Sequence, residues 1–149
     1  MRRLALVLLL LYPLLSCGQS ANLEVKDAWT RDTIGRTANA AIFMVITSQR
    51  DDRLIGASTP IAQKTDLMTI TGGNGAMEMK YLKGIDILAN KRVSLNSGGL
   101  HVWLANLERP LRAGQTFPLF LNFEKAGQRR VTVSVISPAA APPMSRTQM

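Results

Sequence analysis

Residues 116–136 read TFPLFLNFEKAGQRRVTVSVI, and this stretch decides the fold class. Its second half places Val131, Val133 and Val135 at alternate positions, so their side chains point to one face of an extended strand. Its first half is another short apolar run, and the Ala-Gly pair at 126–127 between the halves is a turn signal. The stretch therefore predicts two antiparallel strands joined by a tight turn.

The rest of the chain repeats this pattern of short apolar runs separated by Gly, Pro, Asn and Asp. Turn signals recur about every ten residues, and no stretch shows a sustained helical period. Many short strands at this spacing predict an all-β single domain built as an antiparallel sandwich or barrel. The expected strands are Leu23–Trp29, Ala38–Ser48, Arg53–Ser58, Lys64–Thr71, Ala76–Tyr81, Arg92–Leu95, His101–Leu107, Thr116–Glu124 and Arg129–Ile136.

The N-terminal segment predicts export from the cytoplasm. Residues 1–16 begin with Met-Arg-Arg and continue with an apolar run from Leu4 to Leu11, which is typical of a secretory signal peptide. The run is shorter than the roughly 20 residues that a membrane-spanning helix needs. Cys17 follows Leu-Leu-Ser, which resembles a bacterial lipobox, so we expect it to be lipidated and to anchor the chain in the periplasm or cell envelope. Ordinary cleavage after Ala21 is the alternative.

Two further boundaries follow from composition. Residues 23–136 hold all the expected strands and form the predicted β-sandwich domain. Residues 137–149 are rich in Pro, Ala and polar residues, and we expect a disordered tail there. Either form of N-terminal processing leaves the domain without cysteine, and hence without a disulfide or a thiolate metal ligand.

The charge and aromatic content limit the classes of partner. The net charge is +8, of which Arg2 and Arg3 belong to the leader, so the domain carries about +6. Aromatic residues make up only 5% of the chain, which provides no basic and aromatic platform for nucleic acid. We expect no nucleic-acid partner, and membrane contact only through the N-terminal lipid.

An enzyme is not indicated by the sequence. His101 is the one histidine, no cysteine remains as a nucleophile, and no serine lies in a Gly-x-Ser-x-Gly elbow. The Gly-Gly-Asn-Gly run at 72–75 is not followed by a helical pattern or by Lys-Ser/Thr, so it predicts a hairpin turn and not a phosphate loop.

Methionine is the unusual residue type, with seven in the chain. Met77 and Met79 alternate on one expected strand and so share a face, and His101 and Trp103 do the same on a later strand. Soft thioethers with an imidazole favour Cu(I) over zinc or hard cations. Methionines at alternate strand positions are also ordinary core filler, so the residues alone leave both interpretations open.

The spacing of these residues resembles the signature of a known family. Ten residues separate Met68 from Met79, twenty-one separate Met79 from His101, and one separates His101 from Trp103. This resembles the periplasmic copper chaperone family PCu(A)C, whose motif is His or Met, ten residues, Met, twenty-one residues, His, one residue, Met. Further similarity lies in Asp27–Arg31, Leu54–Pro60, Gly98–His101, Arg109–Leu111 and Phe123–Gly127.

The resemblance implies a cupredoxin-like Greek-key β-sandwich with an exposed copper site at one end. It implies that Met68, Met79 and His101 bind Cu(I). It also implies delivery of Cu(I) toward the copper centres of respiratory oxidases such as cytochrome c oxidase, together with thioredoxin-like copper-transfer proteins.

Trp103 departs from the motif, because the family has a fourth ligand, Met, at this position. Either the site is three-coordinate and the indole covers the metal through a cation–π contact, or the site has decayed. Met77 is an auxiliary candidate, since it shares a face with Met79. The competing function is a degenerate, non-metal-binding envelope lipoprotein that acts as an interaction module. An electron-transfer cupredoxin is disfavoured because the copper thiolate is missing.

Overall fold

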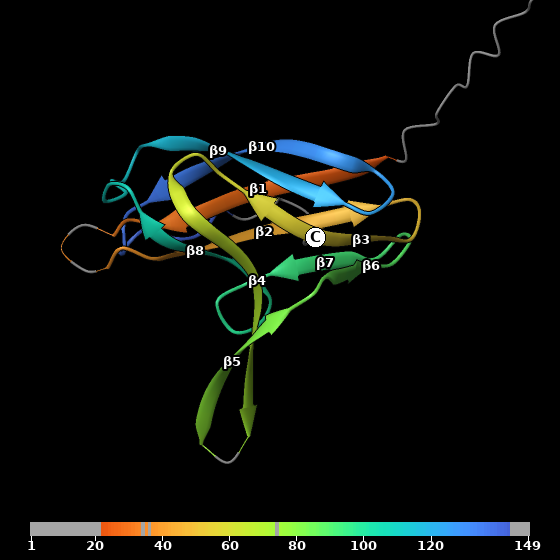
Figure 1. Cartoon of the computed structure of the whole chain (residues 1–149), viewed down its shortest axis with the longest axis horizontal. Helices are drawn as coiled ribbons and strands as arrows, with labels where there is room; N and C mark the ends of the chain where they lie inside the picture. Colours follow the sequence, from red (N-terminus) through yellow and green to blue (C-terminus); the bar gives the residue numbers. More distant parts are fainter. Residues whose placement is uncertain (1–21, 34, 36, 74, 144–149) are drawn as a thin grey trace, which may run out of the picture.

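The computed structural model of the chain describes residues 22–33, 35, 37–73 and 75–143. Over these residues the chain is built from ten β-strands, and no helix occurs among them (Figure 1). The predicted all-β class is therefore confirmed. The strands are β1 (Leu23–Arg31), β2 (Ala40–Ser48), β3 (Asp52–Ser58), β4 (Ala62–Gly73), β5 (Ala76–Leu82), β6 (Ile85–Ile87), β7 (Arg92–Leu95), β8 (His101–Leu107), β9 (Thr116–Phe123) and β10 (Gly127–Ile136).

The strands form one hydrogen-bonded path in the order β5-β4-β8-β2-β1-β10-β9-β3-β6, and β7 pairs with β2 beside it. β2 pairs with two strands in succession, because Ala40 to Ile42 pair with β8 on the path whereas Met44 to Thr47 pair with β7 beside it. The pairing of β1 with β10 is parallel. Since these are the first and last strands, the C-terminal parts of both lie side by side and connect β2 with β9 in the path.

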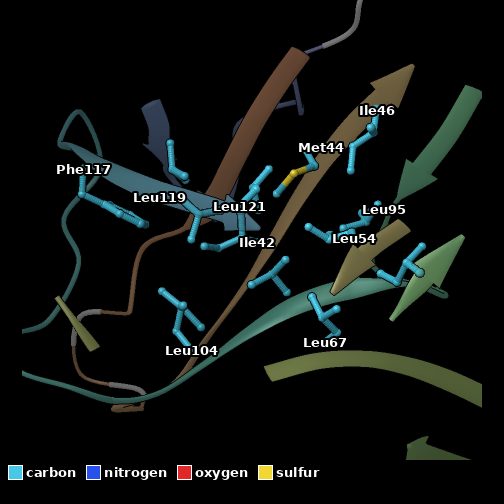
Figure 2. Close-up of a cluster of buried hydrophobic side chains, with 14 of the residues drawn as sticks. Ile42, Met44, Ile46, Leu54, Leu67, Leu95, Leu104, Phe117, Leu119 and Leu121 are labelled. Carbon is cyan, nitrogen blue, oxygen red and sulfur yellow. The ribbon is translucent and has the colours of Figure 1, made fainter. Parts of the chain in front are cut away.

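The hydrophobic core lies inside this folded path (Figure 2). Ile42 and Met44 on β2 pack in one cluster with Leu119 and Leu121 on β9, and each of the four side chains is 1% exposed or less. Full burial of such a side chain contributes about 1.5–3 kcal/mol. Truncation of Leu121 to Ala would remove contacts that cannot re-form and would cost about 2–5 kcal/mol.

The nine strands expected from the sequence are all present, with ends that differ by a few residues. The alternation in β10 is confirmed, since Val133 and Val135 are buried in the core. β6 was not predicted, because Ile85–Ile87 is too short to show a period, although Ile85 and Ile87 are both buried. β6 pairs with β3 at the end of the strand path.

β4 and β5 form a hairpin that extends away from the body of the sandwich (Figure 1). Their pairing runs from Leu67 opposite Leu82 to Gly73 opposite Ala76, which confirms the turn predicted at 72–75. Gly75 closes the turn with a φ of +83°, a left-handed conformation that glycine adopts readily. This hairpin carries the three methionines that the sequence singled out.

The predicted leader at 1–16, Cys17 and residues 144–149 lie outside the described residues. The first residues after β10 lie beside β1, because Arg31 Nη1 donates a hydrogen bond to the Pro138 carbonyl oxygen at 2.7 Å. Within the described ranges, we find no helix of sufficient length and apolarity to cross a membrane.

Candidate metal centre

Met68 on β4 and His101 on β8 are direct cross-strand partners. Partners in an antiparallel pair point to the same face, with Cβ atoms about 4.5–5.5 Å apart. Met68 is 4% exposed and His101 is 2% exposed. Their chain neighbours Leu67 and Val102, which also pair with each other, point the opposite way into the main core. Met68 and His101 therefore form a buried pair on the far side of the sheet from the core.

The imidazole of His101 has a defined orientation. Its Nδ1 lies 2.9 Å from the carbonyl oxygen of Gly99, which can only accept a hydrogen bond. Nδ1 therefore carries the proton of the neutral ring, and the lone pair is left on Nε2. The backbone N–H of Ile70 donates to the same carbonyl oxygen at 3.2 Å. This arrangement is the one that metal-binding histidines use to hold their free nitrogen toward an ion.

Two aromatic rings border His101. The indole of Trp103 lies 6.2 Å from the imidazole between ring centroids, at an edge-on angle of 72°. The ring of Phe43 lies 6.4 Å away at 60°. Trp103 is partly buried and stands opposite Asp66 on β4 and Ala41 on β2. The aromatic rings thus occupy the space beside the imidazole on the β2 side.

The other two methionines lie on β5, which is the end strand of the path. Met79 stands opposite Ile70, two residues along β4 from Met68, and is 44% exposed. It therefore lies diagonally from Met68 on the same face, a spacing of about 7–8 Å that long side chains can bridge. Met77 stands opposite Gly72 and is 84% exposed. Tyr81, not Met79, is the direct partner of Met68.

The structure places the candidate ligands on one face, but it corrects the expectation of an exposed site. Met68 and His101 lie on inner strands of the path, where the neighbouring strands and the rings of Phe43 and Trp103 surround them. Met79 alone of the three lies open to solvent. The candidate centre is therefore buried at its imidazole end and open at its hairpin end.

A carboxylate also lies close to this centre, which the sequence analysis did not single out. Asp66 is the next residue from Met68 on the same face, and its Oδ2 lies 3.0 Å from Lys64 Nζ. The hydrogen bond and charge of Asp66 raise the pKa of Lys64. Lys64 Nζ also lies 5.1 Å from the Tyr81 ring centroid. The Asp66 charge is thus compensated by Lys64.

The donor set here is soft. Across the described parts of the chain, His, Cys, Asp and Glu do not come together in any group of three that could hold a metal ion. The candidate centre instead offers thioether sulfurs and one imidazole nitrogen, which favour Cu(I) over zinc or calcium. Phe43, Asp66 and the Gly99 carbonyl were missed from the sequence, because each contact depends on strand register or loop geometry that has no local signal.

Comparison with protein families gives a match over most of the chain. The model of the family described as "Putative lipoprotein LpqE-like" matches residues 23–135. A curated relative, the putative lipoprotein Lxx21020 of Leifsonia xyli subsp. xyli, is 31% identical over 119 residues, which cover 78% of this chain and 71% of the relative.

Solved structures with the same fold include PCuAC domains. The solution structure of CuI-DR1885 from Deinococcus radiodurans is 28% identical, with a TM-score of 0.66, and the match covers 83% of this chain and 85% of that one. The copper-bound PCuAC domain from PmoF2 is 24% identical with a TM-score of 0.63, covering 78% and 93%. The apo PCuAC domain from PmoF1 is 19% identical with a TM-score of 0.66, covering 78% and 94%. The last two likenesses show the fold alone, and the predicted cupredoxin-like β-sandwich is confirmed.

Proposed function

The chain belongs to the family described as "Putative lipoprotein LpqE-like", and on that premise we propose that it is a copper chaperone of the cell envelope. The match to a protein solved with Cu(I), at 28% identity, supports copper as the cargo. The neutral, soft donor set supports Cu(I) as its oxidation state. The proposal describes a carrier and not a catalyst, in keeping with the Cu(I) form in which the 28% identical protein was solved.

In this proposal Met68, Met79 and Nε2 of His101 bind Cu(I). The observation that carries the proposal is the direct pairing of Met68 with His101, combined with the Gly99 carbonyl that leaves Nε2 unprotonated. Met79 reaches the same ion from the open side, because it shares their face and lies one diagonal step away. Neutral ligands can be exchanged one at a time without separating charge, which suits an ion that must later be released.

Trp103 takes a covering role in this site. Its indole has no lone pair for ordinary coordination, but it lies at 72° to the His101 ring, on the same face as Met68. A cation close to an indole face gains about 0.5–2 kcal/mol from the ring quadrupole. The site is then three-coordinate, with the indole excluding water where the PCu(A)C motif has its last methionine.

The resemblance to the PCu(A)C family supports delivery of Cu(I) to the assembly of respiratory oxidases. Lipidation of Cys17 would hold the domain at the membrane surface of the periplasm, close to membrane-bound oxidases. Acceptors would include oxidase subunits and thioredoxin-like copper-transfer proteins. The positive charge of the chain, about +6 without the two leader arginines, favours acidic docking faces on these partners.

A second candidate function is the interaction module that binds no metal. The burial of both Met68 and His101 favours it, because a buried thioether beside aromatic rings is also ordinary packing. The tryptophan at position 103 favours it as well, because the PCu(A)C motif has a methionine ligand there. This candidate predicts that a variant of Met68 would leave the function of the protein unchanged so long as the fold persists.

Anaerobic titration with Cu(I) against a competing chelator tests the proposal. We expect the full chain to withdraw Cu(I) from the chelator with a stoichiometry of one ion per chain. We expect Cu(II) to bind far more weakly, since the site has no thiolate and one imidazole. If the chain does not compete with the chelator for Cu(I) while circular dichroism shows an intact fold, the result would favour the interaction module.

A further inference from the structure

The methionines of the hairpin form a series of decreasing exposure toward the imidazole. Met77 is 84% exposed, Met79 is 44% exposed and Met68 is 4% exposed. In the strand pairing, Met77 stands opposite Gly72, Met79 opposite Ile70, and Met68 opposite Tyr81. These three pairs follow one another along the same face of the hairpin. The three sulfur-bearing side chains therefore lie on one face, at steps that lead from the hairpin end to His101.

Nothing on β4 covers Met77. Gly72, directly opposite, has no side chain, and a Cβ added there would come within 4 Å of only the Ala76 carbonyl oxygen. The hairpin end also stands away from the rest of the sandwich (Figure 1). The Met77 thioether is therefore free to swing either toward an approaching protein or back toward Met79, one same-face step along β5.

Packing does not explain a methionine at this position. An exposed thioether buries little apolar surface, so core filling, which is the ordinary role of methionine, does not apply. Polar residues hold the intervening positions of β5, where Glu78 and Lys80 form an ion pair at 3.6 Å. The face of β5 that carries Met77 and Met79 is thus apolar and sulfur-bearing, whereas its other face carries the ion pair.

We propose that Met77 is a transfer ligand, which takes Cu(I) from a donor and passes it to Met79 and then to the Met68–His101 pair. This inference rests on the proposed function. The transfer exchanges one neutral Cu–S bond for another, so it needs no electron, proton or co-reactant. The donor is a protein or small carrier that presents Cu(I) on thioether or thiolate sulfur. Release follows the same steps in reverse.

A transfer ligand has a distinct kinetic signature. It lowers the barrier for Cu(I) to enter and to leave by the same factor, so it changes both rates and leaves the equilibrium affinity unchanged. A resident ligand such as Met68 instead stabilises the bound state and changes the affinity. The two roles are separated by measuring rate and affinity on the same variants.

The experiment mixes the full apo chain with Cu(I) held by bicinchoninate and follows loss of the coloured complex by stopped flow. We compare wild type with Met77→Leu, which keeps the apolar volume without a donor sulfur. Thr71→Val is the matched control, because Thr71 is exposed at the same end of the hairpin but lies on the opposite face, paired with Glu78, and carries no sulfur. Met77→His restores a borderline soft donor at this position.

We expect Met77→Leu to slow both uptake and release about tenfold, which corresponds to about 1.4 kcal/mol of barrier, with the affinity within about twofold of wild type. Thr71→Val should transfer at the wild-type rate, and Met77→His should recover most of the loss. Unchanged rates in Met77→Leu would overturn the transfer role while leaving the chaperone proposal standing. A tenfold loss of affinity would make Met77 a resident ligand and also overturn it. A wild-type chain that binds no Cu(I) would overturn both proposals.

Discussion

Ile70 and His101 donate hydrogen bonds to the same acceptor, the carbonyl oxygen of Gly99, at 3.2 and 2.9 Å. The backbone of the β4–β5 hairpin is thereby connected through one loop oxygen to the ring that faces Met68. The loop itself is closed by Asn96 and Leu100, whose backbone hydrogen bond spans 2.8 Å. The orientation of the imidazole is therefore built into the fold before any metal arrives.

The first prediction concerns the tautomer of His101. Because the Gly99 carbonyl cannot donate, the neutral ring should carry its proton on Nδ1 in the apo protein. A long-range ¹⁵N–¹H NMR spectrum of the imidazole reports this directly, and His101 is unambiguous as the one histidine of the chain. Cu(I) should then shift the Nε2 resonance far more than Nδ1. An apo ring protonated on Nε2 would contradict the proposed ligand atom.

The second prediction concerns Met68. Met68→Leu should lower the affinity for Cu(I) by at least about 10- to 100-fold, which corresponds to about 1.4–2.8 kcal/mol of binding free energy. Losses of this size are typical even when the substituted residue only supports a metal ligand. The fold should persist, because this exchange nearly conserves volume and usually costs less than about 1.5 kcal/mol.

Met44→Leu is the matched control for Met68→Leu. Met44 is equally buried but points into the main core from β2, and so it should leave copper binding unchanged. Chelator competition gives the affinities and urea unfolding gives the stabilities of both variants. Equal affinity in the two variants would show that the Met68 sulfur is packing and would favour the interaction module.

The third prediction concerns Trp103. The chain has two tryptophans, so Trp29→Phe leaves Trp103 as the single indole emitter. Phenylalanine preserves an aromatic contact with Phe43, which lies 4.8 Å from Trp29 between centroids. If Cu(I) binds beside the His101 ring, the remaining fluorescence should be quenched in proportion to copper bound and should saturate at one equivalent. Emission that stays constant while chelator competition registers binding would place the ion away from Trp103.

How far the sequence predicted this structure depends on how local each feature is. Period-two alternation at Val131, Val133 and Val135 is visible within one strand, so β10 and strands like it were predicted correctly. β6 was missed because three residues carry no period. The pairing of Met68 with His101 depends on the register of β4 against β8, which residue spacing alone does not specify.

The exposure of the candidate site was predicted wrongly for a related reason. The family resemblance implied an exposed site, but nothing in the sequence shows what covers the face that Met68 and His101 share. Phe43 lies beside His101 only because β2 pairs next to β8 on the outer side of that sheet. Family resemblance supplied the candidate ligands, and strand order determined how deeply they lie.

The fourth prediction concerns Asp52, which ties β3 to the turn between β9 and β10. Its carboxylate accepts hydrogen bonds from the backbone N–H groups of Arg53 at 2.7 Å, Lys125 at 2.9 Å and Ala126 at 2.9 Å. Burial by itself raises the pKa of Asp52, but these hydrogen bonds and the Lys125 charge outweigh it, so the pKa lies below its ordinary value. Asp52→Ala leaves the three N–H groups without their acceptor and should destabilise the fold by about 2–4 kcal/mol.

The pH dependence of stability isolates the charge of Asp52. A carboxyl whose pKa is lower in the folded state than in the unfolded state stabilises fully above the unfolded value of about 4, and this stabilisation is lost as the pH falls through the lower folded value. Urea unfolding should therefore show that the free energy of unfolding of wild type falls between pH 7 and pH 3. The fall should be smaller in Asp52→Ala. Asp86→Ala is the control, since Asp86 makes only an exposed ion pair with Arg53 at 3.7 Å, worth about 0–1 kcal/mol. If Asp52→Ala lost as much stability on acidification as wild type, the turn would not be held by the ionised carboxylate.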